Sequence, residues 1–167
     1  MIQENSERRV AVDWEDPRSL AASARELSGL EFLQKIVVGE LPPPPLAKLL
    51  NFALVEVSKG HAVFAVKPAE YHYNPIGVVH GGLAATLLDS AMGCAVHSSL
   101  PAGSGYTTLE IKVNLIRAMT AETGQIRAEA KLVHLGRQTA IAEGRVVDED
   151  GRLYAHGTTT CLILSPR

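Results

Sequence analysis

The sequence is poor in aromatic residues, in cysteine and in excess charge of either sign. Aromatic residues make up 5% of the 167 residues, and the only two cysteines are Cys94 and Cys161. Each cysteine lies in an apolar segment without the spacing of a metal site or a redox pair, so we expect two buried, reduced thiols. The net charge is −2, from 16 basic and 18 acidic residues. Such a balance does not favour a nucleic-acid partner.

Long hydrophobic runs are also missing. No apolar stretch approaches the roughly 18 residues of a membrane span. The polar start MIQENSERRVAVDWED lacks the apolar core of a secretory signal. The histidines are scattered without metal-ligand spacing, and the sequence has no phosphate-binding glycine loop or dinucleotide motif. These absences predict a cytoplasmic protein with no membrane span, no metal ion and no bound cofactor.

Residues 1–44 are predicted to form a polar segment followed by short helices. Two short helices are expected, separated at Gly29 and stopped by Gly39. The sequence LPPPPL at 41–46 cannot continue either helix, because proline lacks the amide donor and collides with the preceding turn. We therefore predict a domain boundary at this point, with the main domain at 45–167.

The main domain is predicted to be an antiparallel sheet with one long helix. In the run 109–115, apolar and polar residues alternate, which is typical of a sheet with one dry face. Leu109, Ile111, Val113 and Leu115 fall on the apolar side. The predicted order is β-β-α-β-β-β-β, and consecutive hairpins favour antiparallel pairing. The fold is therefore expected to belong to the α+β class. The strand runs are 52–57, 61–68, 106–117, 124–134, 138–148 and 152–164.

A single charge interrupts the long helical segment. Asp89 is the only charged residue among the fourteen from Leu83 to Val96. A helix that is apolar on every side is predicted to be buried on every side, and a carboxylate there is costly to desolvate without a partner. Asp89 is therefore a candidate functional residue. The structural alternative is a carboxylate capped by Ser90 or by a backbone amide across an interface.

A second candidate site precedes the same helix. His80-Gly81-Gly82 follows the pair Asn74-Pro75. Glycines at a helix start let another group approach the backbone closely, and the unpaired N–H groups there stabilise a negative oxygen. This pattern is typical of an oxyanion site, although a simple glycine cap after a proline loop has the same sequence.

Asp89 and Gly81 are too far apart to act on one carbonyl group within one chain. They are eight residues apart, which is about 12 Å along a helix. A catalytic carboxylate has to come within about 3.5 Å of the carbon whose oxygen the Gly81 N–H holds. A site that uses both groups therefore requires two chains, with two antiparallel helices and two equivalent sites about a two-fold axis.

The segment 74–89 resembles the signature of hotdog-fold acyl-CoA thioesterases of the phenylacetate-pathway and 4-hydroxybenzoyl-CoA types. It reads N-P-x-G-x-x-H-G-G-x-x-A-x-x-x-D, and the resemblance covers about residues 45–165. It implies a curved antiparallel sheet around one central helix. It also implies hydrolysis of aromatic or medium-chain acyl-CoA to free acid and CoA, in which CoA is part of the substrate. The implied partner is a second copy of the chain, in a dimer or a tetramer of two dimers.

The resemblance also implies roles for individual residues. Asp89 would be the nucleophile or the general base, and the Gly81 N–H would polarise the thioester carbonyl. His80 and Asn74 would shape the side of the site that the partner contributes. Thr108 would position the water molecule or Asp89. The implied CoA-binding set consists of Arg117, His134, Gly136, Arg137, Gln138 and Thr139.

Two other functions remain open at this point: a hotdog acyl-CoA hydratase or dehydratase, and a non-catalytic acyl-CoA-binding domain. The hydratases need a histidine base close to the reacting carbon, usually paired with a carboxylate in another pattern. A non-catalytic domain would not need the set Asn74, His80, Gly81 and Asp89. The identity of the acyl group, the chemical role of Asp89, the tetramer arrangement and the role of residues 1–44 stay open.

Overall fold

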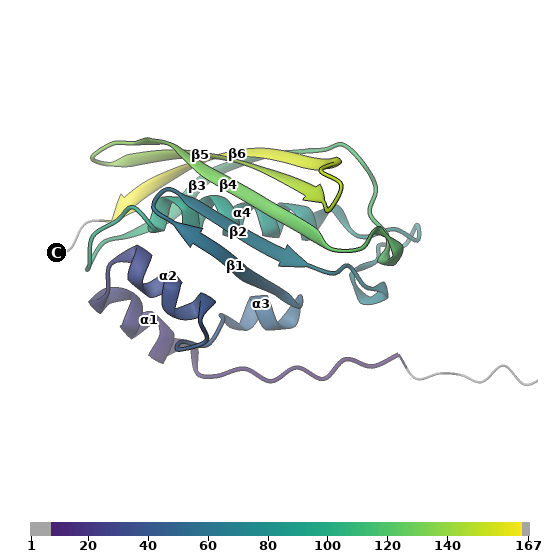
Figure 1. The fold of residues 1–167 in the computed structure, drawn as a ribbon, viewed down its shortest axis with the longest axis horizontal. Coiled ribbons are helices and arrows are strands. Elements are labelled where there is room, and N and C mark those ends of the chain that lie inside the picture. Colours follow the sequence, from purple (N-terminus) through teal and green to yellow (C-terminus); the bar gives the residue numbers. More distant parts are fainter. Residues whose placement is uncertain (1–7, 165–167) are drawn as a thin grey trace, which may run out of the picture.

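The structure, a computed structural model, describes residues 8–164 and shows a curved antiparallel sheet around a long helix (Figure 1). The six strands lie in the order β1-β2-β4-β5-β6-β3. The predicted order β-β-α-β-β-β-β is confirmed. Residues 1–7 and 165–167, at the two ends of the predicted segments, lie outside the described residues. The strands are β1 (Phe52–Ser58), β2 (His61–Val66), β3 (Gly105–Leu115), β4 (Ile126–Leu135), β5 (Thr139–Asp148) and β6 (Leu153–Leu164).

Four α-helices lie within residues 8–164. They are α1 (Pro17–Glu26), α2 (Gly29–Val37), α3 (Pro45–Leu49) and α4 (Gly81–His97), with short 3₁₀ turns η1 (Glu70–His72) and η2 (Ala121–Thr123). In this part of the chain, no helix has the length and hydropathy that crossing a lipid bilayer requires.

Gly29 begins α2 rather than separating the two N-terminal helices. Helix α1 already ends at Glu26, and Ser28 caps the start of α2. The predicted break is therefore displaced by one or two residues. The Gly29 N–H donates a 3.1 Å hydrogen bond to the Leu100 carbonyl, and a Cβ at Gly29 would collide with the His97 carbonyl. Glycine is needed here because α2 lies directly against the end of α4.

The proline run contains the start of a helix that the sequence pattern did not predict. Pro44 caps α3 and Pro45 is its first residue, a position where the missing amide hydrogen is not needed. Gly39 follows α2 with a φ of 79°, in agreement with the predicted stop. Phe32 and Leu33 of α2 are buried in the same apolar cluster as the sheet and α4. The domain boundary at residue 44 stays a prediction.

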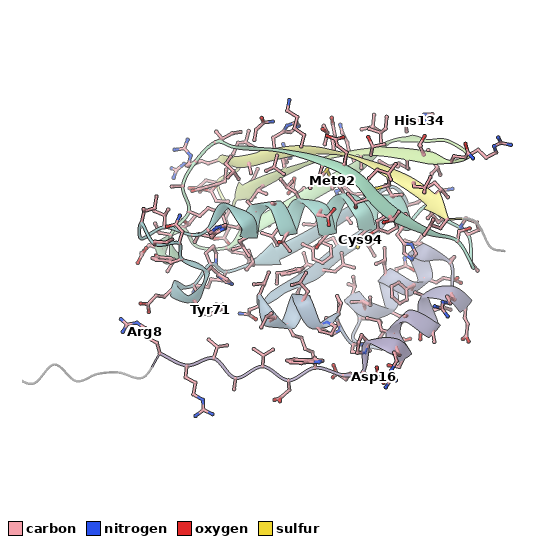
Figure 2. All side chains as sticks on the ribbon, turned by 180° about the vertical axis from the view of Figure 1, so that it is seen from behind. Arg8, Asp16, Tyr71, Met92, Cys94 and His134 are labelled. Atoms are coloured by element: carbon pink, nitrogen blue, oxygen red, sulfur yellow. The ribbon has the colours of Figure 1, made fainter. Side chains whose placement is uncertain are left out.

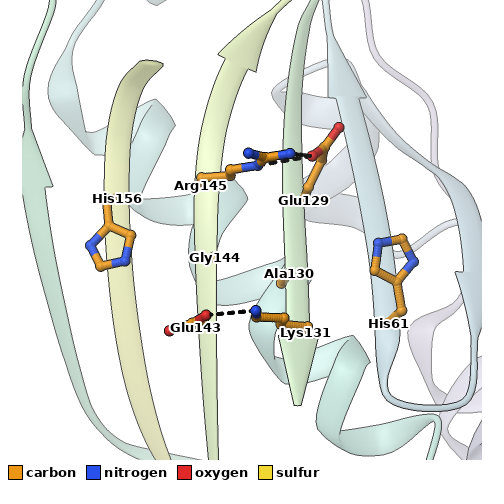
Figure 3. Close-up of a pocket in the computed structure, with 8 residues that line it drawn as sticks. All are labelled: His61, Glu129, Ala130, Lys131, Glu143, Gly144, Arg145 and His156. Carbon is orange, nitrogen blue, oxygen red and sulfur yellow. Dashed lines mark hydrogen bonds and ion pairs between the residues drawn. The ribbon is translucent and has the colours of Figure 1, made fainter. Parts of the chain in front are cut away.

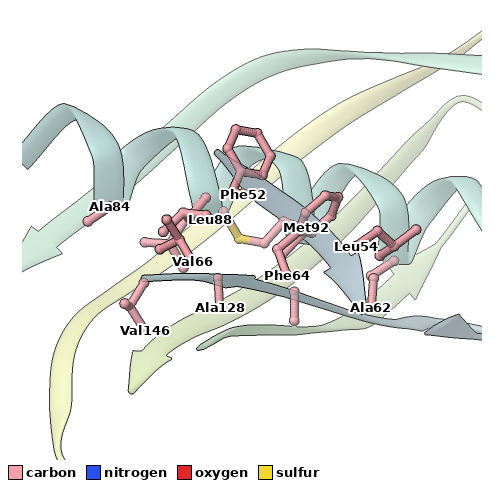
Figure 4. Close-up of a cluster of buried hydrophobic side chains, with 14 of the residues drawn as sticks. Phe52, Leu54, Ala62, Phe64, Val66, Ala84, Leu88, Met92, Ala128 and Val146 are labelled. Atoms are coloured by element: carbon pink, nitrogen blue, oxygen red, sulfur yellow. The ribbon is translucent and has the colours of Figure 1, made fainter. Parts of the chain in front are cut away.

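Small residues on the inner face of the sheet allow α4 to lie close to it. A Cβ on Gly144 or Gly157 would press against the side chains of Leu88 and Met92. Both of these side chains are fully buried, in a cluster that includes Phe64 (Figure 4). Burying each such side chain stabilises the fold by about 1.5–3 kcal/mol. This packing fixes the rotation of α4 and therefore the direction in which Asp89 points.

The two edges of the sheet differ in what covers them. Strand β1 packs against α2 and α3 (Figure 1). Strand β3, at the other edge, pairs only with β6 within the described residues. It exposes Leu109, Ile111 and Leu115, and Leu115 is 60% exposed. A long edge strand with exposed apolar side chains is a surface with which another chain can pair.

Candidate active site

Asp89 lies on a face of α4 that the sheet of its own chain does not cover. Asp89 is exposed, whereas Leu88 and Met92, which face the sheet, are fully buried. Met92 is labelled on α4 in Figure 2. The prediction that the helix is buried on every side is therefore wrong for the single chain. The uncovered face carries small side chains and no second charge. Its members are Gly82, Ala85, Thr86, Asp89 and Ser90.

Thr108 is the hydrogen-bond partner of Asp89. Its Oγ1 donates a 3.0 Å bond to Asp89 Oδ1. Strict alternation along β3 would place Thr108 on the same face as Glu110 and Lys112, away from the helix. A β-bulge at Leu109 adds one residue between Thr108 and Glu110. The bulge reverses the alternation and turns Thr108 toward α4. The role implied for Thr108 is thus compatible with the geometry, although the strand pattern alone would have missed it.

His80 caps the start of α4 through its side chain. Its Nδ1 accepts a 2.8 Å hydrogen bond from the Gly82 N–H, and its carbonyl accepts one of 3.0 Å from the Leu83 N–H. In the neutral ring the proton must then lie on Nε2, which can only donate. The Gly81 N–H lies at the first helical position, where no carbonyl one turn earlier is available. No hydrogen bond within residues 8–164 has this N–H as its donor.

Asn74 is held next to Gly81 by the loop that precedes the helix. Its Oδ1 accepts hydrogen bonds from the N–H groups of Ile76 (3.1 Å) and Val78 (3.2 Å). The side-chain NH₂ is therefore left to donate to another group. A hollow of ≈ 250 Å³ lies beside this loop and is lined by Asn74, Val78, Val79, Gly81, Ala84, Leu115, Ile116, Arg117, Ala118, Met119 and Tyr154. Asp89 is not among the lining residues.

Strand β3 runs along the border of the uncovered face of α4 and contacts the helix at three points. A Cβ on Gly81 would collide with the side chain of Leu115, and a Cβ on Gly93 would collide with Tyr106. Between these two points, Thr108 bonds to Asp89. The single chain thus keeps the Asp89–Thr108 pair apart from the helix N-terminus, as the helix spacing predicts. Sequence reasoning missed Leu115 and Tyr106, although the two glycines indicate where side chains approach the helix.

The residues implied to bind CoA lie at opposite ends of the sheet. Arg117 follows the end of β3, and its guanidinium carbon lies 5.9 Å from the centre of the Tyr154 ring. The β4–β5 hairpin, with exposed His134, Arg137, Gln138 and Thr139, lies near the start of β3, because Thr139 pairs with Leu162 and Leu162 pairs with Thr107. The Gly136 N–H is used within the turn, where it donates to the Thr139 carbonyl at 2.8 Å. One chain therefore does not bring Arg117 and this hairpin together.

The two cysteines lie close to Asp89 but are poor nucleophiles. Burial raises the pKa of the Cys94 thiol to about 12, and the negative charge of Asp89 adds to this rise. Burial also raises the pKa of Cys161. Both residues are free cysteines in the structure. Near neutral pH both stay protonated, so they serve as small apolar side chains rather than as thiolates.

A polar hollow of ≈ 370 Å³ lies elsewhere, on the outer face of the sheet (Figure 3). Two ion pairs cross it, from Lys131 to Glu143 (3.1 Å) and from Arg145 to Glu129 (2.9 Å). None of the residues expected to act on a substrate lines it. Within residues 8–164, no group of three or more His, Cys, Asp or Glu residues is placed to hold a metal ion.

Comparison with known proteins yields consistent matches. The family model of the thioesterase superfamily matches residues 76–155. The 1,4-dihydroxy-2-naphthoyl-CoA hydrolase of Listeria monocytogenes is 27% identical, over 73% of this chain and 98% of its own length. A conserved protein from Pseudomonas aeruginosa has a similar structure, with a TM-score of 0.69 and 33% identity over 73% of this chain and 95% of that chain. A phenylacetic acid degradation-related protein from Ralstonia eutropha has a TM-score of 0.70 and 28% identity, over 78% and 98%.

Proposed function

The chain belongs to the thioesterase superfamily and is a thioester hydrolase, and on this basis we propose that it hydrolyses acyl-CoA in a site shared by two chains. The predicted hotdog fold and the predicted family are confirmed. The observation that carries the shared site is the separation, within one chain, of the Asp89–Thr108 pair from the unpaired Gly81 N–H. The products are a free acid and CoA, and the acyl group is aromatic or of medium length.

The exposed edge of β3 supports a dimer. Its apolar residues Ile111 and Leu115 lie beside the uncovered face of α4, and Ile76, in the loop before α4, is 84% exposed. A second copy that pairs its β3 with this edge would bury these side chains and place the two α4 helices side by side. A tetramer of two such dimers rests on the family resemblance alone, and light scattering measures it directly.

A single two-fold axis is compatible with the pairing of both α4 and β3 between the two copies. If the partner's Gly81 lies beside Asp89, the axis crosses α4 midway between residues 81 and 89 of one chain, near Ala85. On β3, the residues beside Gly81 and Asp89 are Leu115 and Thr108. Their midpoint lies near residues 111–112. Both elements are therefore compatible with an antiparallel pair of α4 helices above an antiparallel pair of β3 strands.

A cysteine at position 112 tests this pairing. Lys112 faces outward, near the proposed axis, so two copies of Lys112→Cys lie within reach of a disulfide bond. We expect mild oxidation to convert most of this variant to a covalent dimer on a non-reducing gel. Lys131→Cys, exposed on β4, is the matched control and should stay uncrosslinked. A dimer in solution that gives no crosslink at position 112 would rule out β3 pairing.

Thioester hydrolysis follows from the groups that this dimer brings together. The partner's Gly81 N–H donates to the thioester carbonyl oxygen and stabilises its negative charge as the tetrahedral intermediate forms. Asp89 either takes a proton from water, whose oxygen then bonds to the carbonyl carbon, or attacks that carbon itself. The C–S bond breaks, and CoA leaves as a thiolate that takes up a proton. In the second route, water then hydrolyses the anhydride between Asp89 and the acyl group and releases the free acid. Thr108 occupies Asp89 Oδ1, which leaves Oδ2 for either route.

A single turnover in ¹⁸O-labelled water separates the two routes. Covalent catalysis forms an anhydride between Asp89 and the acyl group. When water attacks the Asp89 carboxyl carbon of this anhydride, the acid leaves with an unlabelled Asp89 oxygen and ¹⁸O stays in the protein, so label in the protein identifies the covalent route. In the general-base route, the label enters the acid at once and the protein stays unlabelled. Mass spectrometry of the peptide that contains Asp89 distinguishes them.

The dimer also brings the expected CoA-binding residues to the same end of the extended sheet. With Lys112 at the two-fold axis, the partner's Arg117 lies opposite Thr107, near the start of β3. Thr107 pairs with Leu162 of β6, and Leu162 pairs on its other side with the hairpin residue Thr139 of β5. Three strand spacings of ~4.8 Å place the partner's Arg117 about 14 Å from this hairpin. An extended ligand such as CoA can contact both.

Substituting Arg117 or Arg137 with alanine is expected to raise KM for acyl-CoA and to leave kcat nearly unchanged. Contacts with the phosphates do not change as the thioester reacts, so they stabilise the bound substrate and the transition state equally. We expect a rise of roughly five- to thirty-fold at low salt, weaker at high salt because both side chains are exposed. Arg145→Ala, on the outer hollow, is the control. Unchanged KM in both variants would place CoA elsewhere.

An acyl-CoA panel tests the proposed function as a whole. Benzoyl-, phenylacetyl- and hexanoyl-CoA should release free thiol, measured with a thiol reagent. Hydration of crotonyl-CoA without thiol release would indicate a hydratase, and saturable binding without either product would indicate a binding domain. The geometry at His80 weighs against a hydratase, because Nδ1 already accepts the Gly82 N–H, which leaves Nε2 to donate rather than to act as a base. No thiol release from any thioester would refute the proposal.

A further inference from the structure

Tyr106 lies one helical turn beyond Asp89, between β3 and α4. It precedes Thr108 by two residues on β3, so both side chains face the helix. A Cβ on Gly93 would collide with both the ring and the hydroxyl group of Tyr106. The ring therefore rests directly on the helix backbone, at the turn that follows Asp89 toward the C-terminal end of α4.

Two further rings support Tyr106 from behind. The ring of His97 lies 5.8 Å from that of Tyr106, and on its other side the ring of Phe32 lies 5.8 Å away, edge to face. His97 is buried, and neither of its ring nitrogens has a hydrogen-bond partner among residues 8–164. Burial lowers the pKa of His97, which favours the neutral ring. This row joins the candidate site to helix α2, so the N-terminal helices help to hold Tyr106 in place.

The surroundings of Asp89 on this side suit an apolar group. Cys94 and Cys161 lie close by as protonated thiols, because their pKa values are raised. Burial also raises the pKa of Tyr106 well above its usual value, and the charges of nearby groups, among them Asp89, add to the rise. The contact with Gly93 places the ring one helical turn from Asp89, where it can meet the acyl group of a thioester whose carbonyl carbon lies at that carboxylate.

We propose that Tyr106 limits the length of the acyl group, because its ring fills the space between β3 and α4 that a longer chain needs. The inference rests on the proposed function and adds to it a residue that determines specificity. Gly93 is part of this arrangement, since any side chain there would displace the ring. Truncating Tyr106 to alanine removes the ring but keeps the strand, and so opens room for several carbon atoms beyond Asp89.

The test compares the acyl-length profiles of the wild type, Tyr106→Ala and Tyr106→Phe. The substrates are hexanoyl-, dodecanoyl- and hexadecanoyl-CoA, and kcat/KM is measured for each. We expect Tyr106→Ala to raise the ratio of dodecanoyl- to hexanoyl-CoA by about tenfold or more, because each extra methylene that a pocket accepts changes discrimination by roughly that factor. Tyr106→Phe keeps the ring, and its profile should match that of the wild type.

The outcomes separate the length limit from the proposed function. A wild type that hydrolyses hexanoyl-CoA, together with an alanine variant of unchanged profile, overturns the role of Tyr106 and leaves the thioesterase activity intact. A wild type that hydrolyses no acyl-CoA refutes the proposed function itself. Circular dichroism and light scattering check that Tyr106→Ala is folded. If Tyr106→Ala does not fold, Tyr106→Leu replaces it, because leucine retains apolar packing against His97 and Gly93. The proposal then requires Tyr106→Leu to prefer longer acyl chains than the wild type does.

Discussion

Replacing Asp89 with asparagine is expected to lower kcat by on the order of 10²–10⁴, with little change in fold or in CoA binding. Asparagine has nearly the same shape but can neither accept a proton from water nor attack a carbonyl carbon at a useful rate. Its side-chain oxygen can still accept the Thr108 hydrogen bond, so the local packing should survive. The measurement is steady-state hydrolysis of the best acyl-CoA in the panel.

A matched substitution distinguishes catalysis from a general effect of charge. Asp150→Asn, in the exposed turn between β5 and β6, removes the same charge outside α4 and β3. Its kcat should equal that of the wild type within a factor of about two. Circular dichroism and the affinity for CoA, measured by calorimetry, should be the same for both variants. If Asp89→Asn kept activity within a few-fold of the wild type, another group would have to activate the attack.

Much of the fold could be predicted from periodicity alone. Alternation in the long strands and the single long apolar segment give the element order, because one helix has to bury its surface against one sheet. Helix α3 escaped prediction because proline both ends helices and begins them. The sequence pattern placed the break before α2 at Gly29, although that glycine makes a close contact with the end of α4.

The candidate site was only partly readable from the sequence. The lone charge of Asp89 and the glycines of α4 are local signals, and the helix rise alone separates Asp89 from Gly81. The contact with Thr108 depends on the bulge at Leu109, which simple alternation does not reveal. Tyr106 belongs to the neighbourhood of Asp89 only because β3 folds back along the helix. Such contacts between distant segments have no pattern in the chain.

The exposure of Asp89 in the single chain could not be predicted from the sequence either. An all-apolar helix predicts burial, but the sequence does not say whether its own chain or another supplies the cover. The sheet of one chain covers only the face that carries Leu88 and Met92. The adjacent face, with Ala85 and Asp89, stays open beside the unpaired edge of β3. A charge in an otherwise apolar helix is thus compatible with the single chain, and its burial is expected only in the proposed dimer.

Removing the Gly81 N–H is expected to reduce kcat by on the order of 10²–10³, the usual effect of losing one oxyanion donor. Gly81→Pro achieves this, because proline has no amide hydrogen and is well tolerated at the first position of a helix. The preceding residue, His80, has φ −61° and ψ 132°, which a following proline accepts. Gly81→Ala is the control. It adds the same Cβ beside the flexible Leu115 side chain but keeps the N–H, so its loss should be smaller by about tenfold.

Combining the two inactive variants tests whether one site is built from two chains. In a dimer of one Asp89→Asn chain and one Gly81→Pro chain, one site contains both substitutions and the other contains neither. Co-expression with two different tags and purification through both isolates this mixed dimer. We expect it to have about half the wild-type activity, since one of its two equivalent sites is intact. Each variant alone should stay inactive. If Asp89 and Gly81 acted within the same chain, both sites of the mixed dimer would carry one substitution, and the mixed dimer would be as inactive as its parents.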